Sequence, residues 1–77
     1  MNIYLISQDD NPEYDTYDSC VVVAETEEEA KNTLPCEASS FNIHGDWASC
    51  PEKVTVIFLG TTTHLPKGVV LGSFNAG

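Results

Sequence analysis

Residues 20–35, CVVVAETEEEAKNTLP, carry the main fold signal of this chain, because an apolar run in them leads directly into a short acidic helix. Val21, Val22 and Val23 are β-branched, so they suit a pleated strand and lose side-chain freedom in a helix. An unbroken apolar run of this kind indicates a strand that is buried on both faces. The other segments are expected to pair with this strand or to pack on the helix.

The helix has a start signal and a stop signal. Thr26 offers a hydroxyl to the first free backbone N–H groups, and Glu29 is placed to reach back to the N–H of Thr26, which is the pattern of a capping box. Pro35 disfavours helical geometry at Leu34, so the helix is predicted to end there or one residue earlier. A helix of about two turns is stable only when it docks on a sheet.

Three further apolar runs predict strands, at residues 2–7 (NIYLIS), 53–59 (KVTVIFL) and 69–74 (VVLGSF). The sequence therefore predicts an α+β fold of order β-β-α-β-β, in which one short helix covers one face of a four-stranded, mainly antiparallel sheet. The first two strands and the last two strands are each expected to form a hairpin. Residues 1–77 are expected to form a single small domain, which leaves little room for a deep pocket.

Two long connections link these elements. Residues 8–19 (QDDNPEYDTYDS) are rich in turn-forming residues and predict a loop in which Tyr14 and Tyr17 fold back over the sheet. Residues 36–52 show no clean period and predict an irregular segment. Its large apolar side chains are expected to fasten it to the core, because each would otherwise forgo roughly 1.5–3 kcal/mol of burial; they are Phe41, Ile43 and Trp47.

Cysteine usage and hydropathy indicate a cytoplasmic protein. Cys20, Cys36 and Cys50 are odd in number and form no Cys-x-x-Cys pair, which argues against a disulfide framework and against a ribbon-type zinc site. We expect all three to be reduced and metal-free. No stretch approaches the roughly 18 apolar residues of a membrane span, and the N-terminus lacks the basic flank of a signal peptide. The expected location is the cytosol, with no membrane partner.

The net charge of −9 is confined to one half of the chain. Residues 1–37 hold ten of the twelve carboxylates and one of the three lysines, so they sum to −9, whereas residues 38–77 sum to zero. Affinity for phosphates comes from Lys and Arg, and the chain has no arginine, so nucleic acid is not expected as a direct ligand. Proteins with basic surfaces are the expected partners.

Neither metal binding nor catalysis is predicted. An EF-hand loop counted from Asp9 would require glycine where Tyr14 stands and glutamate where Cys20 stands. Cys36, His44 and Cys50, with Cys20 or His64 as a fourth ligand, match no zinc module by their spacing. An acidic chain also lacks the positive surroundings that activate a thiolate. We therefore expect a non-enzymatic protein with no cofactor.

Three segments together resemble a family of small bacteriophage and prophage accessory proteins. They are Tyr14-Asp15-Thr16-Tyr17-Asp18-Ser19 before the valines, a Trp-x-x-x-Pro element from Trp47 to Pro51, and Gly68-Val-Val-Leu-Gly-Ser-Phe-Asn-Ala-Gly77. The resemblance implies a phage protein that disables or redirects host machinery, including CRISPR and other defence systems, in the host cytosol. It implies no catalytic residue.

The sequence and the resemblance together predict a non-catalytic inhibitor or modulator that docks an acidic face on a basic, nucleic-acid-binding host protein. Carboxylates would provide long-range attraction and two tyrosines would provide the buried anchor. The predicted partner-binding residues are Asp9, Asp10, Glu13, Tyr14, Asp15, Tyr17, Asp18, Glu25, Glu27, Glu28 and Glu29. The alternatives are a small oligomer that sequesters a nucleotide or metabolite, with apolar edge strands serving self-association, and a minor virion component.

Mimicry of DNA depends on how densely these acids lie. Spread over half of a surface of about 4,600 Å², ten carboxylates give one charge per roughly 230 Å², against one per roughly 100 Å² for duplex DNA. The densities become comparable only if residues 9–18 and residues 25–29 lie side by side.

Overall fold

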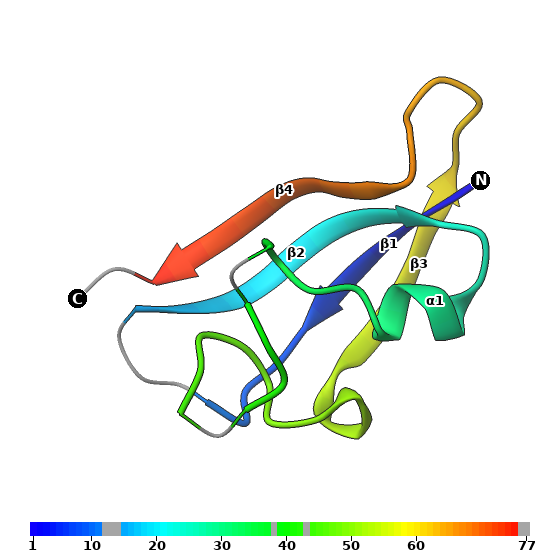
Figure 1. Ribbon diagram of the computed structural model, residues 1–77. Helices are drawn as coiled ribbons and strands as arrows, with labels where there is room; N and C mark the ends of the chain where they lie inside the picture. The colour runs from blue at the N-terminus through cyan, green and yellow to red at the C-terminus, as the bar shows by residue number, and fades with distance from the viewer. Residues whose placement is uncertain (12–14, 38, 43, 76–77) are drawn as a thin grey trace.

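The structure, a computed structural model, describes residues 1–11, 15–37, 39–42 and 44–75. In chain order the elements are β1 (Asn2–Ser7), β2 (Thr16–Ala24), α1 (Glu27–Lys31), the 3-10 turn η1 (Pro51–Lys53), β3 (Thr55–Thr61) and β4 (Gly68–Asn75). The four strands form one antiparallel sheet, and α1 and the connection after it lie over one face of it (Figure 1). The predicted four-stranded antiparallel sheet with one short helix is confirmed.

The order of the strands differs from the prediction. β1 pairs with β2 as expected, but the sheet order is β3-β1-β2-β4, so the predicted hairpin of the last two strands is wrong. β3 pairs with β1, which places Val56 and Phe58 beside Ile6 and Tyr4. β1 and β2 form the centre of the sheet, and β3 and β4 pair with their outer edges. Residues 62–67 carry the chain from one edge of the sheet to the other (Figure 1).

Two element boundaries also differ from the prediction, the start of β2 and the end of α1. β2 begins at Thr16 rather than after Ser19, because the polar residues at its start pair with the end of β4. The helix ends at Lys31, short of Leu34. Side chains after it take up its last carbonyls: Asn32 Nδ2 donates to Glu28 O at 2.8 Å, and Thr33 Oγ1 donates to Glu29 O at 2.9 Å. These bonds satisfy groups that a further helical turn would otherwise bind.

The core lies between the sheet and the covering layer. Tyr4, Ile6, Cys20 and Val22 come from the sheet, and the fully buried Trp47 comes from the irregular segment. Phe41 packs against this cluster, so two of the three predicted fastening residues are confirmed, and Ile43 lies outside the described residues.

Candidate functional site

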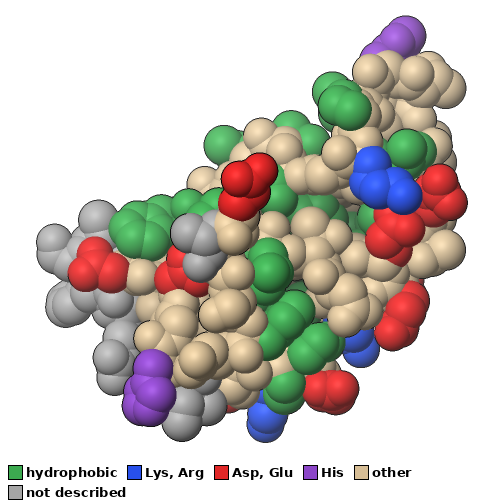
Figure 2. All heavy atoms as spheres, viewed as in Figure 1, with side chains coloured by type: hydrophobic (Ala, Val, Ile, Leu, Met, Phe, Trp, Pro, Cys, Tyr) green, Lys and Arg blue, Asp and Glu red, His purple; other side chains and the backbone are tan. Residues whose placement is uncertain are grey.

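The predicted acidic residues fall into two groups at opposite ends of β2. The loop acids are Asp9, Asp10, Asp15 and Asp18, and the helix acids are Glu25, Glu27, Glu28 and Glu29. Between Asp18 and Glu25 the chain runs seven residues in extended conformation, a distance of about 23 Å. Figure 2 shows carboxylates gathered toward both ends of the molecule, with single further carboxylates near its middle and at its lower edge. Glu13 and Tyr14 lie outside the described residues.

The separation answers the question of DNA mimicry. A charge density like that of DNA requires the two groups to lie side by side. The structure instead places them at the two ends of a nine-residue strand. The predicted acidic residues that the structure describes therefore form two small, separate groups, and the single acidic face that the sequence suggested is not present among them.

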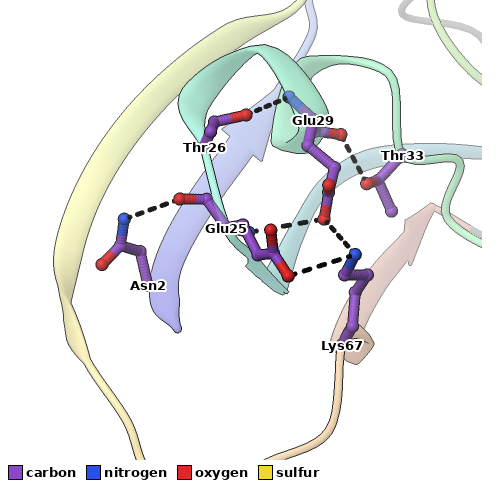
Figure 3. A network of polar contacts seen from close by, with 6 residues as sticks. All are labelled: Asn2, Glu25, Thr26, Glu29, Thr33 and Lys67. Atoms are coloured by element: carbon purple, nitrogen blue, oxygen red, sulfur yellow. Dashed lines mark hydrogen bonds and ion pairs between the residues drawn. The ribbon is translucent and has the colours of Figure 1, made fainter.

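The helix acids are partly used inside the protein (Figure 3). Thr26 Oγ1 accepts a hydrogen bond from Glu29 N at 3.1 Å, which confirms the predicted cap, while Glu29 Oε1 accepts from the N–H of Glu25 at 3.3 Å, one residue before the predicted donor. Lys67 Nζ lies 3.1 Å from Glu29 Oε1 and 3.8 Å from Glu25 Oε1. The hydrogen bond from Lys67 lowers the pKa of Glu29 and, in return, raises the pKa of Lys67.

This network leaves an uneven charge at the α1 end. The ion pairs in the described part of the chain compensate Glu25 and Glu29 but do not include Glu27 or Glu28, which are both exposed. The helix end therefore presents two uncompensated carboxylates, Glu27 and Glu28, and a second pair, Glu25 and Glu29, that shares the single positive charge of Lys67.

Among the loop acids, Asp10 has a structural role. Its Oδ2 accepts hydrogen bonds from Ser49 Oγ at 2.6 Å and from Ser49 N at 2.9 Å, and these bonds lower the pKa of Asp10. Next to it, Asn11 Nδ2 donates to Gly45 O at 2.7 Å. Both contacts fasten the β1–β2 connection to residues 45–49.

The other described loop acids are free to face a partner. Asp9, Asp15 and Asp18 are exposed, and no ion pair in the described ranges involves them. Asp15 has a positive φ of 62°, a left-handed conformation that Asp and Asn tolerate better than most residues. A substitution that tests the charge of Asp15 must therefore keep this backbone geometry.

Tyr17 lies in β2 rather than in the predicted loop, and its ring packs against the sheet beside Gly72. It is half-buried against the core, and burial, together with nearby Cys36, raises the pKa of its phenol. Its ring meets the ring of Phe74 edge to face, with centroids 4.9 Å apart. Phe74 is 47% exposed. Among the described residues at the loop-acid end, the accessible aromatic group is thus Phe74, and the ring of Tyr17 packs against it.

Sequence reasoning missed Phe74 because its position depends on pairing. β4 pairs with β2, which places Phe74 opposite Tyr17 and beside the chain that carries Asp15 and Asp18. A predicted hairpin of β3 and β4 would have kept Phe74 away from the loop acids. An aromatic residue near the end of an apolar run was the available signal, but it did not say which residues would surround it.

A second pair of rings has similar geometry at the opposite edge of the sheet. Tyr4 and Phe58 meet edge to face with centroids 5.8 Å apart, and Phe58 is 57% exposed. Phe58 lies on β3, two strands away from the strand that carries Asp18. It therefore provides a matched comparison for Phe74.

The thiols are not grouped for metal binding within the described residues. No group of three or more His, Cys, Asp or Glu side chains there is placed to hold a metal ion. Burial raises the pKa of the Cys20 thiol to about 11, which keeps it protonated at neutral pH. Cys36 Sγ lies 3.2 Å from Ser39 Oγ, which donates to Asp46 Oδ2 at 3.0 Å.

Comparison with known proteins adds no relative. No family model matches this chain, and no match was found among curated protein sequences or among solved structures. In the part of the chain that the structure describes, no helix has the length and apolar character needed to cross a lipid bilayer.

Proposed function

We propose that this protein is a non-catalytic binding protein that docks its loop-acid end on a basic surface of a partner protein. The observation that carries the proposal is an exposed aromatic ring, Phe74, set beside uncompensated carboxylates at Asp15 and Asp18. Charges at the rim of an interface mainly accelerate association, and a desolvated aromatic side chain more often carries the affinity. This end of the molecule supplies both.

The resemblance to phage accessory proteins indicates which class of partner to expect. A basic surface of the required size is typical of proteins that bind nucleic acid. In a host cell, a small acidic protein that occupies such a surface would compete with nucleic acid there and so inhibit or modulate the partner, for example a defence component.

The anchor is tested by a matched pair of substitutions. The bait is the purified protein, and the partner is captured from host lysate, identified, purified and measured for affinity. Phe74→Ala is expected to weaken binding by roughly 30-fold or more, as is usual for an aromatic hot spot. Phe58→Ala removes a somewhat more exposed ring at the other edge and should leave the affinity unchanged. Equal losses in both variants would contradict the proposal.

The attraction is tested by neutralising each acidic end in turn. Asp15→Asn with Asp18→Asn removes two charges at the loop end and keeps the left-handed backbone at residue 15. This double variant should slow association and flatten its dependence on salt. Glu27→Gln with Glu28→Gln removes two charges at the helix end and serves as the control. If the control slows association as much as the loop variant, the binding site does not lie at the loop end.

A further inference from the structure

The sheet has a second face that α1 does not cover, and its side chains form rows across all four strands. We call it the open face. The strand register aligns Ile57, Leu5, Val21 and Leu71 in a central apolar row. A row of hydroxyl side chains lies on one side of it, made of Thr55, Ser7, Ser19 and Ser73. On its other side, Ile3 and Val23 lie between Gly60 and Gly68, and here Val23 is fully buried, so this third row is less accessible than the central row.

The ends of the central row are exposed to an unusual degree for large apolar residues. Ile57 is 47% exposed and Leu71 is 68% exposed. A shallow hollow of about 310 Å³ lies over β1, β2 and β4, and Leu5, Val21 and Leu71 are among the residues that line it. The open face thus has exposed apolar side chains on both edge strands, Ile57 on β3 and Leu71 on β4, and a shallow depression beside Leu71.

None of the three rows contains a charged residue, although the chain has a net charge of −9. These rows offer no charge for a basic partner to recognise, because none of the described carboxylates belongs to them. For a second copy of the chain, in contrast, the open face allows close approach without placing carboxylates directly against one another.

We propose that two copies of this protein pack their open faces together around a twofold axis. A twofold interface uses the same patch on both copies, so the patch must be complementary to itself. Rotation would bring Ile57 of each copy toward the hollow of the other. The result is a two-layered β-sandwich with sheets about 10 Å apart, a common packing of apolar sheet faces.

The area makes this a weak dimer. Four strands about 4.8 Å apart and rows that span about six residues give a face of roughly 400 Å² in projection. Stable interfaces bury about 800 Å² per partner, so the dimer belongs with the small, transient interfaces. Its formation is expected to depend on protein concentration.

Salt separates this interaction from partner binding. Two chains of charge −9 repel each other, and raising NaCl from about 0.01 M to about 1 M shortens the screening length from about 30 Å to about 3 Å. Self-association through an apolar face should therefore strengthen with salt, whereas docking of acidic groups on a basic partner should weaken. The two interfaces can fail independently.

Sedimentation equilibrium of the purified protein over a range of concentrations tests the dimer. As the concentration increases, the weight-average mass should rise from near 8.4 kDa toward twice that value. In high salt this rise should occur at lower protein concentrations. Leu71→Lys should weaken dimerisation tenfold or more, since it replaces an apolar contact with a charge in both copies. Ile57→Lys should do the same. Leu65→Lys, the same change at a 41%-exposed leucine in the β3–β4 connection, should behave like the unmodified protein.

Three results would overturn the proposal. They are a monomer at every concentration and salt, an association that salt weakens, and equal behaviour of the Leu71→Lys and Leu65→Lys variants. Circular dichroism of each variant checks that it is folded. An association that persists in both open-face variants would place the contact on another surface and would equally rule out the sandwich.

Discussion

At the scale of single residues, Gly72 determines how closely the Tyr17 ring can approach β4. A Cβ at this position would lie 3.0 Å from Tyr17 Cε1 and 3.2 Å from Tyr17 Cδ1, which is closer than ordinary van der Waals contact. The Tyr17 ring is held between the core and Phe74. Glycine at this point lets one edge of the Tyr17 ring approach the strand closely.

Gly72→Ala is expected to destabilise the protein by about 1 kcal/mol or more, as overpacking usually does, and to displace the Tyr17 and Phe74 rings. Gly60→Ala is the control, because a Cβ there meets no atom within 4 Å. Alanine also loses less backbone entropy than glycine, so this control should be neutral or slightly stabilising. Urea unfolding measures both, and ring chemical shifts follow the displacement. Equal stability of the two variants would show that the ring gives way without cost.

The distinction between local and distant contacts decides which residues could be predicted. The cap of Thr26 by Glu29 follows from residues three apart, and burial of Trp47 follows from its size in a small domain; both were predicted from the sequence. The pairing of Tyr17 with Phe74 joins distant parts of the chain. It follows only from the strand order, which hydrophobic pattern does not specify.

At the scale of elements, α1 is only five residues long and depends on contacts with the rest of the protein. Five residues cannot form a stable helix alone. Ala30 is buried on the core, and Lys67, just before β4, reaches Glu29 and Glu25 at the other side of the helix start. The ion pair therefore links the helix to the β3–β4 connection, a link that the sequence offered no means to predict.

This link predicts a window of pH. The pKa of Glu29 is lowered in the folded protein, so its contribution to stability is present above the ordinary glutamate pKa of about 4.3 and is lost as pH falls through the lower folded value. The pKa of Lys67 is raised, so its contribution is present below about 10.4 and is lost as pH rises through the higher folded value. Stabilisation by the pair is expected between these limits.

Lys67→Met should therefore be less stable than the unmodified protein near neutral pH, and the difference should vanish at both acid and alkaline extremes. The effect is small, because the Lys67 side chain is exposed and the Glu29 side chain is partly exposed, so solvent screens the pair. Lys53→Met removes the same charge from the exposed end of η1 and is the control. Chemical unfolding at a series of pH values gives the comparison. A Lys67→Met difference that does not change with pH would mean that packing of the lysine stem, rather than the ion pair, is responsible.

At the scale of the whole molecule, the sequence predicted the number of strands, their antiparallel pairing and the single helix, but neither the neighbours of each strand nor the shape of the acidic surface. Both failures have one cause. A β3–β4 hairpin and the observed β3-β1-β2-β4 order bury similar apolar runs, and the choice between them decides where Phe74 and the loop acids meet. The sequence shows that residues 55–61 and 68–75 are largely apolar and uncharged, but only the strand order shows that both segments lie at the edges of the sheet.

The connection between β3 and β4 offers a direct test of that order. The two strands lie three strand spacings apart, about 14 Å, and the seven links from Thr61 to Gly68 span up to about 24 Å when extended. Deleting residues 63–66 leaves three links, about 11 Å at most, which cannot cross the sheet. A hairpin, in contrast, would accept the resulting two-residue turn. We therefore expect the deletion to abolish the cooperative thermal transition, whereas inserting four Gly and Ser residues at the same point should cost less than about 1 kcal/mol, because loop entropy grows slowly with length. Circular dichroism melting of the two variants distinguishes the topologies: a deletion variant that melts like the unmodified protein would show that β3 and β4 are neighbours, and with that the placement of Phe74 beside Asp18 would fall.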